Sequence, residues 1–489
     1  MLFNSIEFLF GFLPVALLIY HALRVRGHKT AAKVFLVVAS LFFYGWWDVR
    51  YVPLVVISIL GNFGLSLLME RSGQRSRLIT AVGIGLNLAL LGYFKYANFF
   101  VKSLDGLTGM DIAMHKVVLP LAISFFTFQQ IAYLVEAYRD RKAADSFLDY
   151  CLFVLFFPHL IAGPITHHKE MLPQFKHAGD EPLPLSYVTV GLTILILGLA
   201  KKVVIADTLA DICNPIFHAA DAGRAPSFDY AWLGALSYTL QLYFDFAGYS
   251  DMAIGLSLLF GIRLPVNFAS PYKSTSIIEF WRRWHISLSR FLRNYLYIPM
   301  GGNRQGKIRR HLNLLLTMAL GGLWHGAGWT FLAWGVLHGL YLICNHVWRS
   351  VAPPPKGRAR AAFGWVVTML AVVVAWVLFR AGTFPGALTM LGAMAAPGSS
   401  GFPHDLPPTT LVNWLAVVVA GVAAAWAPNV LEMTRYPNSV PGLPIEADGL
   451  RPVTWRPPPP LATAVGLGVI AAFAFAKLPN PGVFLYFNF

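Results

Sequence analysis

The stretch Leu316 to Gly339 reads LTMALGGLWHGAGWTFLAWGVLHG, an apolar run that crowds four glycines around a central Trp-His-Gly. Basic residues flank it, with Arg310 before it and Arg349 after it. Because loops rich in Lys and Arg stay on the cytoplasmic face of a membrane, the segment Leu312–Trp348 has to enter the membrane and return. Glycines allow the turn that such a hairpin requires. We therefore predict that His325 lies within the membrane, at the bend of a broken helix pair.

Apolar runs recur along the whole chain, which has 489 residues, 56% of them hydrophobic and only 12% charged. The mean hydropathy of +0.58 lies outside the range of ordinary soluble domains. A helix needs roughly 20 apolar residues to cross a hydrocarbon core, where lipid offers the backbone no hydrogen-bond partner. We expect a single all-α polytopic membrane domain over residues 1–489, with about ten to twelve transmembrane helices. The runs are Ser5–Tyr20, Val34–Trp47, Leu54–Met69, Leu78–Phe94, Val117–Leu134, Tyr187–Ala206, Tyr230–Phe260, Leu312–Trp348, Phe363–Phe379, Leu411–Ala427 and Leu461–Ala476.

Lysine and arginine outnumber the acidic residues by 38 to 23, a net charge of +15 that in a soluble protein would suggest nucleic-acid binding. The basic residues instead cluster in alternate loops, at Arg24–Lys33, Arg71–Arg77 and Arg139–Lys142. This positive-inside pattern indicates membrane lipid and no nucleic acid as the partner, and it predicts a non-cytoplasmic N-terminus. Phe147–Gly163 also lies between two basic loops, so it is predicted to enter and return as the segment around His325 does.

Several functional classes lack their sequence signatures. Three cysteines, Cys151, Cys213 and Cys344, give neither a disulfide framework nor a CxxC metal pattern. The chain has no HExxH zinc-protease motif, no GxSxG nucleophile elbow and no GxxxxGK[ST] phosphate loop. We therefore expect no bound metal and none of these hydrolase or pump chemistries.

His325 is the first candidate catalytic residue. A charge at the membrane centre costs roughly 2.5 to 3.5 kcal/mol, so an ionisable residue there is a candidate site by default. Burial disfavours the imidazolium, so the ring would be neutral near pH 7 with a lone pair available for general-base catalysis. The alternative is a core histidine bonded to a neighbouring carbonyl group. The glycines on both sides and the adjacent Trp324 favour a site.

The segment Glu279–Arg304, EFWRRWHISLSRFLRNYLYIPMGGNR, is the second candidate region. Guanidinium groups bind phosphate through paired hydrogen bonds and stack on aromatic rings. The alternative is that its arginines anchor the chain to acidic lipid headgroups. His285, between Trp284 and Ile286, is a second polar candidate for substrate contact.

The third region, QLYFDFAGYSDMAIG at Gln241–Gly255, carries Asp245 and Asp251 inside an apolar run. Uncompensated carboxylates would not stay ionised there, so each needs a cation, a hydroxyl group or water beside it. We expect structural pairing with the arginine-rich segment. The alternative is that Tyr243, Asp245 and Tyr249 line a polar tunnel.

Five segments together resemble the membrane-bound O-acyltransferase family, and most closely its bacterial polysaccharide O-acetyltransferase branch. They are LPLAISFFTFQ (Leu119–Gln129), FFPHLIAGP (Phe156–Pro164), QLYFDFAGYSDMAIG (Gln241–Gly255), PYKSTSIIEFWRRWHISLSRFLRNYLYIPMGGNR (Pro271–Arg304) and GGLWHGAGWTFLAWGVLHG (Gly321–Gly339). The resemblance is strongest over a motif-bearing core at 119–348 and weakest across 381–460.

The resemblance implies an enzyme of the bacterial inner membrane with helices and broken helices around a central tunnel. It would take an acyl group from a cytoplasmic thioester, acetyl-CoA, and pass it to a hydroxyl group of an exported polysaccharide, with no bound cofactor. A separate periplasmic SGNH-type acetyltransferase is an implied partner. The family's signature histidine falls on His325 and its second polar position on His285. Further candidate tunnel or substrate-binding residues are Trp324, Trp284, Arg282, Arg283, Asn294, Tyr243, Asp245 and Tyr249, with Arg282 and Arg283 steering the anionic coenzyme.

His325 would then remove the proton from the attacking hydroxyl group, an effect worth typically about 10² to 10⁴ in rate, or hold the acyl group as an acyl-imidazole. Other functions remain open at this point: transfer of D-alanine or another acyl group to a cell-wall polymer, transport without chemistry by discontinuous helices, and haem ligation by His325 and His338. The sequence does not choose among alginate, cellulose, other exopolysaccharides, peptidoglycan and teichoic acids as the acceptor.

Overall fold

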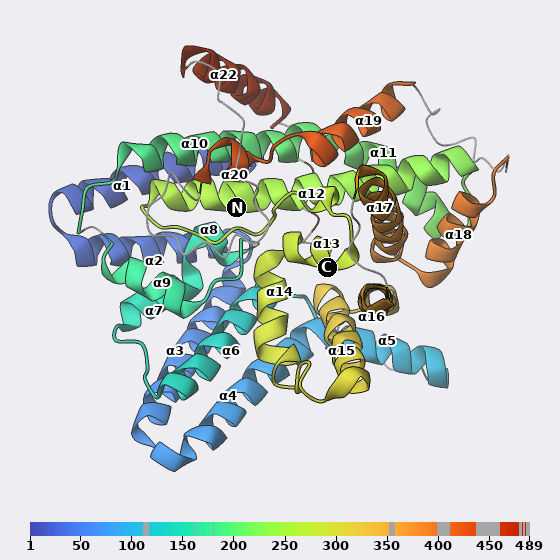
Figure 1. Cartoon of the computed structure of the whole chain (residues 1–489). Helices are drawn as coiled ribbons and strands as arrows, with labels where there is room; N and C mark the ends of the chain where they lie inside the picture. The colour runs from blue at the N-terminus through green and yellow to red at the C-terminus, as the bar shows by residue number, and fades with distance from the viewer. Residues whose placement is uncertain are drawn as a thin grey trace. The chain divides into compact units, whose positions relative to one another are not determined.

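Helices form all the regular structure in the part of the chain that the computed structural model describes (Figure 1). These residues are 1–110, 117–161, 163–178, 180–351, 357–398, 411–436, 460–478, 482 and 485. Within these ranges, six helices are long and apolar enough to cross a membrane: Glu7–Val25, Val49–Arg71, Ser76–Thr108, Leu185–Asp221, Trp329–Val351 and Arg358–Arg380. Shorter apolar helices lie at Phe384–Ala395, Leu411–Trp426 and Leu461–Lys477. The predicted all-α polytopic membrane class is confirmed, whereas the count of ten to twelve crossings stays a prediction.

The chain divides into two compact units, and each takes two segments of sequence. Unit 1 contains Met1–Leu195 and Met252–Pro265, and unit 2 contains Ile196–Asp251 and Val266–Phe489. Two helices, α10 (Leu185–Ala200) and α12 (Phe228–Leu259), begin in one unit and end in the other. The expectation of a single domain stays a prediction.

The regular structure described for unit 1 is helical. Its first pair, α1 (Leu13–Val25) and α2 (Lys29–Gly45), packs side by side, and the turn between them uses Gly27 at φ +79°. The other described α-helices that lie wholly in unit 1 are α3 (Val52–Arg71), α4 (Ser76–Leu91), α5 (Ala97–Thr108), α6 (Ile123–Asp140), α7 (Phe147–Leu155), α8 (Phe157–Leu160) and α9 (His168–Lys176).

Buried polar pairs connect the helices of unit 1. The Asn87 amide donates to Asn62 Oδ1 at 2.7 Å, which joins α4 to α3. The Tyr133 hydroxyl donates to Ser66 Oγ at 2.8 Å, which joins α6 to α3. Hydrophobic burial does not drive helices together within lipid, so such bonds and close packing hold membrane helices in register.

The segment predicted to enter and return, Phe147–Gly163, is broken in the structure. Helix α7 ends at Leu155, and Phe156 turns to ψ 107° before the short helix α8 begins. Gly163 then packs so closely on the backbone of His159 that a side chain at this glycine would overlap it. The break is therefore observed, and its depth in a membrane stays a prediction.

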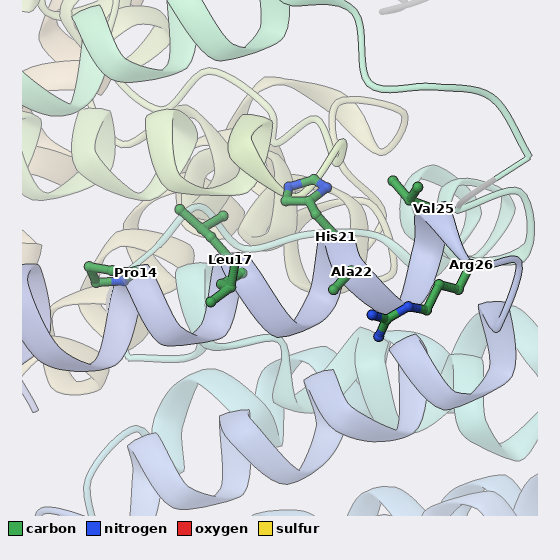
Figure 2. A pocket seen from close by; sticks show the side chains of 7 residues that line it. Pro14, Leu17, His21, Ala22, Val25 and Arg26 are labelled. Carbon is green, nitrogen blue, oxygen red and sulfur yellow. The ribbon is translucent and has the colours of Figure 1, made fainter.

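A shallow, mostly apolar groove follows the exposed side of α1 (Figure 2). His21 is fixed there because its Nε2–H donates to the Leu259 carbonyl oxygen at 2.8 Å. None of the predicted site residues lines this groove, which consists of Pro14, Leu17, Leu18, His21, Ala22, Val25 and Arg26.

Unit 2 holds all of the predicted site residues. Its longest helix, α12, has 32 residues and carries the predicted Tyr243, Asp245 and Tyr249. The other described helices are η5 (Lys201–Ala206), α11 (Asp207–Asp221), η6 (Pro271–Lys273), α13 (Ile277–Arg283), α14 (Ile286–Leu292), η7 (Arg293–Tyr297), α15 (Gly306–His325), α16 (Trp329–Val351), α17 (Arg358–Arg380), α18 (Phe384–Ala395), α19 (Leu411–Trp426), α20 (Val430–Met433) and α22 (Pro460–Lys477).

The predicted hairpin is formed by α15 and α16, which lie side by side in Figure 1. Helix α15 ends at His325, Gly326 is extended, and α16 begins at Trp329. Glycines allow the two backbones to touch. A side chain at Gly322 would overlap the Phe331 carbonyl oxygen, and one at Gly335 would overlap the Met318 carbonyl oxygen. The predicted bend at the Trp-His-Gly motif is confirmed.

Because these backbones touch, we expect Gly335→Ala to force α15 and α16 apart. Overpacking of a tight contact typically costs about 1–3 kcal/mol, so the midpoint of thermal unfolding in detergent should fall by several degrees. Gly392→Ala is the matched control, because this glycine lies within α18 with open space around its Cβ position. The control should unfold at the same temperature or slightly higher. Equal midpoints for Gly335→Ala and the wild type would contradict the close contact.

Candidate active site

The two predicted histidines lie next to each other in unit 2. The ring centroids of His285 and His325 are 6.2 Å apart, with 57° between the ring planes. Both side chains are buried, with exposed fractions of 0% and 5%. His325 comes from the last position of α15, whereas His285 comes from the junction of α13 and α14. The fold therefore brings together two residues that are 40 positions apart in the sequence.

The backbone of His285 adopts an unusual conformation. Its φ of 43° and ψ of 56° lie in the left-handed region, which costs a residue other than glycine roughly 1–2 kcal/mol. Asn267 holds this turn in place, because its carbonyl oxygen accepts from the Ile286 N–H at 2.9 Å and its Oδ1 accepts from the Ser287 N–H at 3.3 Å. Such strain persists where the surroundings determine it, and it is common at functional sites.

The same amide fixes the proton on His285. The backbone N–H of Ser287 can only donate, so the Asn267 atom that faces it is the carbonyl oxygen Oδ1. His285 Nδ1 lies 3.1 Å from that oxygen and therefore carries the hydrogen. His285 is outside the six spanning helices, and burial lowers its pKa to about 3. The ring is thus neutral near pH 7, with its lone pair on Nε2.

Aromatic rings surround His325. Its ring centroid is 4.9 Å from Trp324, 5.2 Å from Trp334 and 5.3 Å from Phe379. Trp334 stacks in turn on Trp376 at 5.6 Å. An enclosure of this kind excludes water, which protects a reactive acyl group from hydrolysis.

Three other predicted residues lie in this aromatic cluster. Trp324 is 6.1 Å from His285 between ring centroids. Trp284 is 5.0 Å from Trp376 and 6.4 Å from Tyr243. Trp324 thus contacts both histidines, whereas Trp284 and Tyr243 belong to the same aromatic cluster; a role of the three in binding substrate stays a prediction.

The remaining predicted polar residues are placed differently. Tyr249 is buried within α12. Asn294 is half-buried in η7, and no hydrogen bond within the described residues joins it to either histidine. Arg282 is exposed. Arg283 is buried, forms an ion pair with Glu279 at 2.9 Å and donates to the Ala269 carbonyl oxygen at 3.1 Å. These bonds fix the position of the Arg283 guanidinium, and its predicted steering of the coenzyme stays a prediction.

The expected pairing of the buried aspartates with the arginine-rich segment is wrong. Asp245 Oδ1 lies 2.7 Å from Lys202 Nζ, and Asp251 Oδ2 lies 2.7 Å from Lys201 Nζ. Both lysines belong to η5, which follows α10, and Gly248 of α12 packs directly against this region. These two lysines are therefore the cationic partners that the two aspartates require. A tunnel-lining role for Asp245 stays a prediction.

Two buried polar residues were not predicted as part of the site. Nothing in the sequence around Asn267 indicates a site residue, because the side chain acts on a turn that lies 18 residues further along the chain, at His285. His338 appeared only as a haem-ligand alternative. The Trp281 indole N–H donates to its Nδ1 at 3.2 Å, so His338 is neutral and carries its hydrogen on Nε2. A ring-to-ring contact of 4.9 Å with Trp334 links His338 to the surroundings of His325.

We expect the Asn267 amide to be a positioning group for His285, and its variants to differ in pH dependence. Asn267→Ala removes the acceptor for His285 and Ser287, so kcat should fall up to about 10²-fold through misplacement of the ring. Asn267→Asp keeps the acceptor and adds a negative charge that raises the pKa of His285. Its activity should be largely retained, while the acidic limb of its pH profile moves to higher pH, because protonation of the ring then begins at a higher pH.

Ser250→Ala is the control for Asn267, because it removes only the outer bond from the Asn267 amide to Ser250 Oγ at 3.3 Å. It should leave both kcat and the pH profile near those of the wild type. Equal losses in the alanine and aspartate variants, without any shift of the profile, would show that Asn267 is structural only.

Comparison with known proteins identifies the same family that the sequence motifs resemble. The model of the membrane-bound O-acyltransferase family matches residues 77–382. A peptidoglycan O-acetyltransferase of Helicobacter pylori is 43% identical over 422 residues, covering 81% of this chain and 80% of that protein. A probable alginate O-acetylase of Pseudomonas aeruginosa is 44% identical over 407 residues, covering 82% and 76%. A teichoic acid D-alanyltransferase of Streptococcus thermophilus is 29% identical over 281 residues, covering 53% and 68%.

Proposed function

Because this chain belongs to the membrane-bound O-acyltransferase family and is an O-acyltransferase, we propose that it transfers an acetyl group from acetyl-CoA to a hydroxyl group of an exported polysaccharide. The observation that carries this proposal is the pair of buried histidines, 6.2 Å apart, within an aromatic enclosure. The acceptor class follows from relatives whose names specify peptidoglycan and alginate. The reaction occurs across the inner membrane, with the donor on the cytoplasmic side.

In the proposed mechanism, the hydroxyl oxygen of the acceptor attacks the carbonyl carbon of the thioester. His325 takes the hydroxyl proton as a new C–O bond forms, and the C–S bond then breaks. The proton passes to the departing thiolate, so the products are an acetyl ester and free coenzyme A. His285 offers its Nε2 lone pair beside His325 and orients the hydroxyl group. In the alternative route, an imidazole nitrogen of His325 attacks the thioester first, so that a C–N bond forms, the C–S bond breaks and coenzyme A leaves as the thiol. The acceptor hydroxyl group then attacks this acyl-imidazole, the C–N bond breaks, and the hydroxyl proton returns to the imidazole.

A second protein can complete the route to the polymer. The acetyl group would leave the membrane enzyme on the periplasmic side, where an SGNH-type acetyltransferase passes it to the polysaccharide. Direct transfer to the polymer is the simpler alternative. The two differ in whether membranes that contain only this chain acetylate the polymer.

The test is transfer of radiolabelled acetyl groups from acetyl-CoA by the purified protein in vesicles, together with mass spectrometry of the cell's polysaccharides with and without the protein. We expect label to leave acetyl-CoA and acetyl esters to disappear from one surface polymer of the deletion strain. Loss of D-alanyl esters would instead favour the chemistry of the 29% identical relative. Unchanged esters in every surface polymer would overturn the proposed acceptor class.

A further inference from the structure

The ends of three helices meet at the basic start of α15. Helices α15 and α16 are antiparallel, with Gly335 against Met318 and Gly339 against Leu315. Continuing this register places the end of α16, with His346 and Arg349, beside the start of α15, with Arg310 and His311. The sequence separates these two groups by more than 30 residues, so only the hairpin brings them together.

Helix α13 joins the same place through two hydrogen bonds. The Ile278 N–H donates to Asn345 Oδ1 at 3.4 Å, and Arg349 donates to Ser276 Oγ at 2.9 Å. Arg282 follows Ile278 by four positions, about one turn further along α13. Consistent with this arrangement, His346 has electrostatic interactions with Arg310, Arg349, His311 and Arg282. We call Arg282, Arg310 and Arg349 the basic cluster.

The basic cluster has no acidic counterpart among the described residues. In the part of the chain that the structure describes, no carboxylate lies within ion-pair distance of these three guanidinium groups. Arg283 is the contrasting case, since Glu279 neutralises it. Arg310 donates to His311 Nε2 at 3.0 Å, and its own Nε is buried without a hydrogen-bond partner. An anion bound between three arginines would reduce the repulsion among their like charges. Guanidinium groups suit phosphate in particular, because they can donate two parallel hydrogen bonds to its oxygens.

From this geometry, we propose that Arg282, Arg310 and Arg349 bind the phosphate groups of the acyl donor, a coenzyme-A-type nucleotide. The inference rests on the proposed function and adds the site that recognises its donor. Arg310 and His325 are 15 residues apart on α15, which corresponds to about 22 Å along the helix. A donor must therefore carry its phosphates and its thioester at opposite ends of a long arm. Coenzyme A has this design, whereas a phospholipid headgroup offers the phosphate alone.

The test compares two donors, acetyl-CoA and acetyl-pantetheine, which has the same thioester arm but no phosphate. We expect Arg310→Gln and Arg349→Gln each to raise KM for acetyl-CoA about 10- to 100-fold, with little change in kcat. KM for acetyl-pantetheine should be the same in wild type and variants. Arg349→Lys keeps the positive charge, so its KM for acetyl-CoA should lie between those of the wild type and Arg349→Gln. Arg360→Gln is the control, because it removes an exposed arginine of α17 outside the basic cluster.

A second set of assays distinguishes the donor from lipid as the source of the bound phosphate. The same proteins are assayed in nanodiscs with and without anionic phospholipid. Equal KM values for acetyl-CoA in wild type and both glutamine variants, with variant activity that no longer responds to anionic lipid, would overturn the donor site and leave the proposed function intact. If the wild type transfers acetyl groups from neither donor, the proposed function fails. Calorimetric binding of coenzyme A to wild type and variants then decides the site independently.

Discussion

Replacement of His325 by alanine is expected to abolish acetyl transfer while the protein remains folded. The imidazole at the end of α15 can take a proton from an attacking hydroxyl group, and its ring centroid lies 6.2 Å from that of His285. Loss of a general base typically lowers the rate by about 10² to 10⁴, and loss of a nucleophile lowers it further. The readout is radiolabel transferred from acetyl-CoA per mole of purified protein, with size-exclusion elution and thermal unfolding as checks of folding.

Two further variants make the result specific to this histidine. His285→Ala should weaken transfer severely, because the second ring of the pair is lost. His21→Ala removes an imidazole that only donates to a backbone carbonyl group in unit 1, so its activity per folded molecule should equal that of the wild type. Full acetyl transfer by His325→Ala would remove the basis of the proposed mechanism, whatever the family of the chain.

The hairpin bend could be predicted from the sequence because its causes are local. Charge on both sides of an apolar segment required a return, and glycines around His325 marked where the return occurs. The structure places the end of α15 at this histidine. His285 could be predicted only through the family resemblance. Nothing near it in the sequence indicates a left-handed turn, since the groups that stabilise it belong to Asn267.

The predicted partners of the buried aspartates were wrong because the true partners come from a distant segment of the sequence. Asp245 and Asp251 needed cations, and the arginine-rich segment offered the greatest number. The actual partners, Lys202 and Lys201, are found only when the packing of η5 on α12 is known.

The basic cluster was predicted only in part, for the same reason. Arg282 was predicted, but Arg310 and Arg349 join it through the register of two helices, which a pattern of residues does not give.

Lys202→Met is expected to have the largest effect on stability. Lys202 Nζ lies 2.6 Å from Asp207 Oδ1 and 2.7 Å from Asp245 Oδ1, and the Lys202 and Asp245 side chains are each only 1% exposed. Removal of one partner from a buried ion pair leaves an uncompensated charge and typically costs about 3–5 kcal/mol. The carboxylates also accept backbone N–H groups, from Gly482 at 3.1 Å for Asp207 and from Leu485 at 3.0 Å for Asp245. We therefore expect little monodisperse protein after detergent extraction and a strongly lowered unfolding midpoint.

The double variant Lys202→Met/Asp245→Leu tests whether the charge itself is the cause. Apolar residues can replace a buried ion pair at little cost, so the double variant should be more stable than Lys202→Met alone. Lys29→Met is the matched control, since Lys29 and Asp180 form an exposed ion pair at 2.8 Å. Exposed pairs contribute at most about 1 kcal/mol, so this variant should unfold near the wild-type temperature. Additive losses in the double variant would mean that Lys202 and Asp245 stabilise the protein by packing and not by their opposite charges.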